Sequence, residues 1–98
     1  MGHIHYILNG HEVVAVDMNT WAKSFQIGDR HVRKTTIGNV DVSTVFLGID
    51  HNWSNGPPLL FETMVFGGSL DEKQERYSTW EEAEKGHAAM VERVKKEG

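Results

Sequence analysis

Two apolar segments of strand length, 40–49 and 59–66, lie in the middle of the chain and need a sheet that can bury both. The first carries apolar residues on both of its alternating faces, which is typical of a central strand. The loop at 50–58 joins the two segments, so we predict that they pair as an antiparallel hairpin. Asn-Gly-Pro-Pro in this loop restricts the backbone and predicts a stiff connection.

Shorter elements are predicted before this hairpin. β-rich stretches at 4–8 and 12–16 flank Asn9-Gly10, a dipeptide that favours a tight hairpin turn. Asp17 can cap a following helix, in which Trp21 belongs to the apolar face. The polar segment 31–37 then reads as an edge strand.

After the central hairpin, 74–78 reads as a further short strand that leads into a final helix. Two overlapping capping boxes, Ser78-x-x-Glu81 and Thr79-x-x-Glu82, mark the start of that helix. Its apolar stripe consists of Trp80, Ala83, His87, Val91 and Val94.

Together these elements predict one α+β domain over residues 1–98, with a small, mainly antiparallel sheet of four to six strands packed by two helices. The predicted order is β-β-α-β-β-β-(β)-α. A chain of 98 residues builds one modest core. Without cysteine it can have neither disulfides nor thiolate chemistry.

Net charge and the absence of targeting signals limit the possible partners and the cellular location of the protein. The formal net charge of −4 disfavours nucleic acid as a partner. The sequence contains neither a signal peptide pattern nor a long apolar run. We therefore predict a cytoplasmic protein that does not engage the membrane.

Five residues are the candidates for a ligand-binding site. Asp50, His51 and Trp53 lie in the loop of the central hairpin, where rigid strands can position them. Glu62 is the carboxylate in an otherwise apolar strand and needs a partner, such as Arg30, Arg33, a histidine or a ligand. Arg30 opens the basic run 30–34, which can hold a phosphate or carboxylate or can be a solvated strand edge.

Other motifs are absent or have a structural reading. Neither HExxH nor a helical His-x-x-x-His pair occurs, so no metal is predicted. Glycine-rich phosphate loops and GxSxG elbows are missing too, and no cofactor is predicted. His87 follows Gly86 on the helix stripe, which favours a core histidine and close packing of the helix on the sheet.

Four strings of residues carry a resemblance to a known group of proteins. They are Asp17-Met18-x-Thr20-Trp21, Val42-Ser43-Thr44-Val45-Phe46-Leu47-Gly48-x-Asp50-His51, Gly56-Pro57-Pro58-Leu59-x-Phe61-Glu62-Thr63-Met64-Val65-Phe66-Gly67-Gly68 and Tyr77-x-Thr79-Trp80-x-Glu82-Ala83-x-x-Gly86-His87. Through them the chain resembles small, functionally uncharacterised proteins encoded by tailed bacteriophages, prophages and related bacterial genomes. The resemblance implies a phage setting, in which small accessory proteins bind a host protein or sequester a signalling molecule of host defence.

The leading hypothesis is a non-enzymatic binding protein, possible as a homodimer or larger homo-oligomer, that holds a small polar or nucleotide-like ligand or a host protein. Trp53 would stack on a planar group, His51 and Arg30 would meet acceptors, and Glu62 would accept from hydroxyls or amines. One alternative is a small hydrolase that uses His51 with Asp50 or Glu62 as acid and base. Another is a structural or interaction module without a small ligand.

Overall fold

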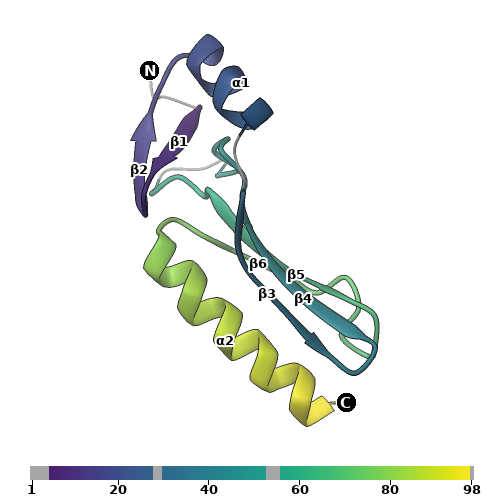
Figure 1. Cartoon of the computed structure of the whole chain (residues 1–98). Helices are drawn as coiled ribbons and strands as arrows, with labels where there is room; N and C mark the ends of the chain where they lie inside the picture. Colours follow the sequence, from purple (N-terminus) through teal and green to yellow (C-terminus); the bar gives the residue numbers. More distant parts are fainter. Residues whose placement is uncertain (1–4, 28–29, 53–55, 98) are drawn as a thin grey trace.

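The computed structural model describes residues 5–27, 30–52 and 56–97. Its elements are β1 (Tyr6–Asn9), β2 (Glu12–Ala15), α1 (Met18–Ile27), β3 (His31–Ile37), β4 (Val40–Phe46), β5 (Phe61–Phe66), β6 (Gln74–Tyr77) and α2 (Trp80–Glu97), as Figure 1 shows. The predicted α+β class and the order along the chain are confirmed. The strands divide between two antiparallel sheets, one of β1-β2 and one in the order β3-β4-β5-β6.

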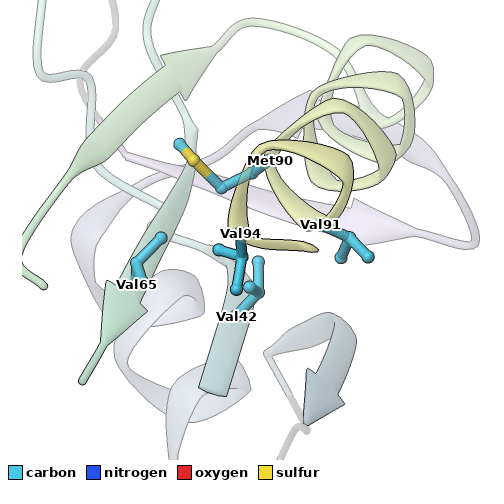
Figure 2. Packing of buried hydrophobic residues seen from close by; sticks show 5 residues of the cluster. All are labelled: Val42, Val65, Met90, Val91 and Val94. Atoms are coloured by element: carbon cyan, nitrogen blue, oxygen red, sulfur yellow. The ribbon is translucent and has the colours of Figure 1, made fainter. Parts of the chain in front are cut away.

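The four-stranded sheet contains the hairpin predicted from the two apolar segments. β4 and β5 are its central strands, and β3 and β6 are its edges. Because side chains alternate along a strand, Val42 on β4 and Val65 on β5 point to the same face. α2 lies across that face, and Met90 and Val94 complete a cluster with these valines (Figure 2). A second cluster joins Phe46, Leu60, Phe61 and Ala83.

The β1-β2 hairpin and α1 lie beyond one end of the larger sheet (Figure 1). The Tyr6 amide donates to the Gly48 carbonyl at 2.8 Å, which ties β1 to the segment after β4. Asp17 caps α1 as predicted, because its Oδ1 accepts from the Thr20 amide at 2.8 Å. The Trp21 ring meets the edge of His5 at 5.1 Å between ring centroids. The predicted apolar face of α1 therefore contacts the N-terminal hairpin.

The start of α2 has the second of the two predicted capping boxes. Thr79 Oγ1 accepts from the Glu82 amide at 3.1 Å, and Glu82 Oε1 accepts from the amides of Ser78 and Thr79 at 3.1 and 3.2 Å. One turn later, a Cβ added to Gly86 would lie 2.2 Å from the Tyr77 ring. Glycine at this position therefore lets the helix approach β6 closely, as the sequence predicts.

Candidate functional site

Asp50 and His51 both help to fold the 50–58 loop. Asp50 Oδ1 accepts from the amides of Asn52 and Leu59, at 2.8 and 3.0 Å. The His51 amide donates to the Leu59 carbonyl at 3.0 Å. These hydrogen bonds join the two ends of the loop, and the Asp50 carboxylate has a structural role there. The third predicted loop residue, Trp53, lies outside the described residues.

Glu62 has its partner on the neighbouring strand. Its carboxylate is 15% exposed and accepts from Arg76 Nε at 3.0 Å. The sequence offered Arg30, Arg33 or a histidine for this role, and the structure corrects this to Arg76, because Glu62 and Arg76 face each other across β5 and β6. The Arg30 side chain is exposed, and its carbonyl accepts from the Phe46 amide at 2.7 Å.

The four predicted residues that the structure describes do not form a catalytic group with one another. No hydrogen bond or ion pair in the described part of the chain joins the carboxylates of Asp50 or Glu62 to the His51 ring. The hydrolase alternative needs such a contact to orient its base. Among the described residues, no group of three histidine or carboxylate side chains has a geometry that could hold a metal ion.

The most deeply buried titratable group that the structure describes is His87, which is 1% exposed on the side of α2 that faces the sheet. Its Nε2 lies 2.8 Å from Thr35 Oγ1 and its Nδ1 lies 2.7 Å from Thr44 Oγ1. Thr44 Oγ1 lies in turn 2.5 Å from Thr63 Oγ1. The imidazole thus links three threonines on β3, β4 and β5, and the prediction of a satisfied core histidine is confirmed.

Two features of its surroundings favour the neutral form of the His87 ring. Burial lowers the pKa of His87, and the nearby Arg33 guanidinium lowers it further. Arg33 itself forms an ion pair with Glu84 at 3.3 Å. Because both ring nitrogens already have hydroxyl partners, the imidazole has no nitrogen left for a substrate, and its geometry is that of a structural group.

The face of the four-stranded sheet opposite α2 is partly exposed. No described helix or strand packs against the face opposite α2 (Figure 1). Alternation and register place Val45, Met64 and Phe66 on this face, and Phe66 is 50% exposed. Lys34 on β3 and Arg76 on β6 lie on the same face at its two sides. We call these five residues the sheet-face patch.

Sequence reasoning treated Glu62 as a single odd residue in the strand 59–66 and did not identify this patch. The signal was present, because Met64 and Phe66 alternate with the core residues Thr63 and Val65. Apolar residues on both sides of an alternating strand require either a second covering layer or an exposed apolar face.

No protein-family model, curated protein or solved structure matches the chain. No helix in the described part of the chain is long and apolar enough to cross a membrane.

Proposed function

We propose that this chain is a non-enzymatic binding protein that engages a protein partner through the sheet-face patch. The observation that carries the proposal is the sheet face opposite α2, with Met64 on β5 and the half-exposed Phe66 at the end of that strand. Apolar residues with a polar and charged rim are the usual composition of a protein interface. The rim is mixed in charge, because Asp41 and Glu62 lie on the same face as Lys34 and Arg76, and Glu62 pairs with Arg76 at 3.0 Å.

The exposed area of the chain supports this reading. The fold exposes 6493 Å². This is about 800 Å² more than the roughly 5,700 Å² expected for a folded monomer of 11.1 kDa. Each partner in a standard protein interface buries about 800 Å². The excess belongs to the whole fold, which measures 43 × 31 × 19 Å. Both the sheet face opposite α2 and the β1-β2 hairpin with α1, which lie beyond one end of the larger sheet, contribute to it (Figure 1).

A small polar ligand at the 50–58 loop receives less support, because backbone amides already occupy the Asp50 carboxylate. The phage setting and a role against host defence stay predictions from the resemblance.

Photo-crosslinking tests the proposal. A photoreactive phenylalanine analogue would replace Phe66 or Met64 in turn, in the cells that naturally produce the protein. The matched control carries the analogue at Met18, which is 63% exposed on α1. We expect protein adducts from positions 64 and 66 but not from position 18, and we expect the adduct from position 64 to disappear in Phe66→Asp.

Mass spectrometry of the adducts identifies the partner. Adducts that form equally from position 18, or none from positions 64 and 66, would contradict the proposal. Denaturing the purified protein also tests the small-ligand reading, because a bound metabolite would be released in a stoichiometric amount. That release, without adducts from the sheet face, would replace the proposed function with ligand sequestration.

A further inference from the structure

Two grooves flank α2, one along each edge strand of the larger sheet. The groove beside β3 has a volume of about 380 Å³ and contains Arg33 and Glu84. The 3.3 Å ion pair between these side chains crosses it from strand to helix. The groove beside β6 is larger, about 520 Å³, and Arg76, Tyr77, Lys85 and Gly86 are among its lining residues. An ion pair therefore crosses the groove on the β3 side of the helix.

The β6 groove is the open one. No ion pair in the described structure crosses it from β6 to α2, because Arg76 pairs with Glu62 and the Glu82 carboxylate accepts from backbone amides. Lys85 is exposed in this groove and has no carboxylate within 4.0 Å among the described residues. Its positive charge is thus available to a bound molecule.

The backbone of β6 adds a second recognition element. β6 ends the sheet, so its outer N–H and C=O groups have no neighbouring strand among the described residues. A groove between a strand edge and a helix suits an extended peptide, which adds as a further strand and places alternate side chains in the groove. The close contact between Gly86 and Tyr77 holds the helix against β6 and fixes the floor of this groove.

The geometry points to a peptide-binding site in the β6 groove. Its occupant is an extended peptide segment that pairs with β6 and directs an acidic side chain to Lys85. This site is separate from the sheet-face patch, although Arg76 contributes to both. It does not depend on the function proposed for that patch.

Fluorescence anisotropy with a labelled hexapeptide of alternating valine and aspartate tests the site. A hexapeptide with lysine in place of aspartate should bind more weakly. Lys85→Glu should weaken binding of the acidic peptide roughly three- to thirtyfold, since an exposed ion pair is worth little and the variant turns attraction into repulsion. Lys96→Glu is the matched control, because it makes the same charge change at the exposed far end of α2.

Amide hydrogen exchange then locates the peptide. We expect the acidic peptide to protect amides of β6 and to leave β3 unchanged. Equal affinity of wild type and Lys85→Glu, protection of β3 alone, or no binding at about 1 mM peptide would overturn the inference. None of these results would alter the crosslinking outcome at position 66, so the two proposals fail separately.

Discussion

Acid should destabilise this protein through His87, whose ring is 1% exposed and bound by Thr35 and Thr44. In the unfolded chain the imidazole takes up a proton near its ordinary pKa of 6.5. In the folded chain burial lowers the pKa of His87, so the proton binds only at lower pH. The contribution of His87 to stability is therefore complete above pH 6.5 and is lost as the pH falls from 6.5 to the folded pKa.

The size of the effect follows from the number of protons involved. Between the unfolded and folded pKa values, the unfolded state holds up to one more proton than the folded state at this site. The free energy of unfolding then falls by at most about 1.4 kcal/mol for each pH unit. Below the folded pKa the contribution of His87 no longer changes, because both states are protonated.

Urea unfolding followed by tryptophan fluorescence at a series of pH values from 8 to 5 measures this slope. His87→Gln removes the titrating group, and the dependence on pH should flatten although the variant is less stable throughout. His31→Gln, which removes an exposed histidine at the sheet edge, shows how much flattening follows from losing any histidine. An unchanged slope in His87→Gln would refute the reasoning. So would a wild-type NMR titration in which the His87 ring protonates at or above pH 6.5.

Two further predictions concern packing at α2, and urea unfolding measures both. Thr44→Val should cost about 1–3 kcal/mol, because it leaves buried His87 Nδ1 without its partner, whereas Thr44→Ser keeps the hydroxyl and should cost less. Gly86→Ala should destabilise the protein despite a gain of about 1 kcal/mol in helix propensity, because the added methyl overlaps the Tyr77 ring and overpacking costs about 1–3 kcal/mol. Ala89→Gly, at an exposed position of α2, measures how much stability differs between alanine and glycine in this helix when packing does not change. A Gly86→Ala variant more stable than wild type would contradict the close packing.

The features that sequence predicts well here are local in the chain. Asp17 reaches an amide three residues away, and Thr79 and Glu82 cap each other at the same spacing. The hydrophobic alternation of the central strands likewise needs no knowledge of distant partners. Such signals depend on the backbone geometry of a single element, so they can be read before the fold is known.

Local sequence signals do not predict which side chains pair across neighbouring strands. Arg76 donates a hydrogen bond to the Glu62 carboxylate because the pairing of β6 with β5 places these two residues opposite each other. For Asp50, the carboxylate beside His51 suggested a binding or acid–base role, but its hydrogen-bond partners are backbone amides within its own loop. A polar residue has several possible partners, and the sequence does not rank them.

The buried hydrogen bonds around His87 could be predicted in part from the sequence, and the rest depends on strand register. Thr44 and Thr63 occupy core positions of alternating strands, and His87 occupies the stripe of α2. Since an unpaired buried polar group costs about 1–3 kcal/mol, three such residues can be expected to bond one another. The fourth member depends on a register shift in β3 between His31 and Arg33. Uninterrupted alternation would put Thr35 on the same face as His31, but the bulge turns Thr35 toward α2, where its hydroxyl reaches His87 Nε2.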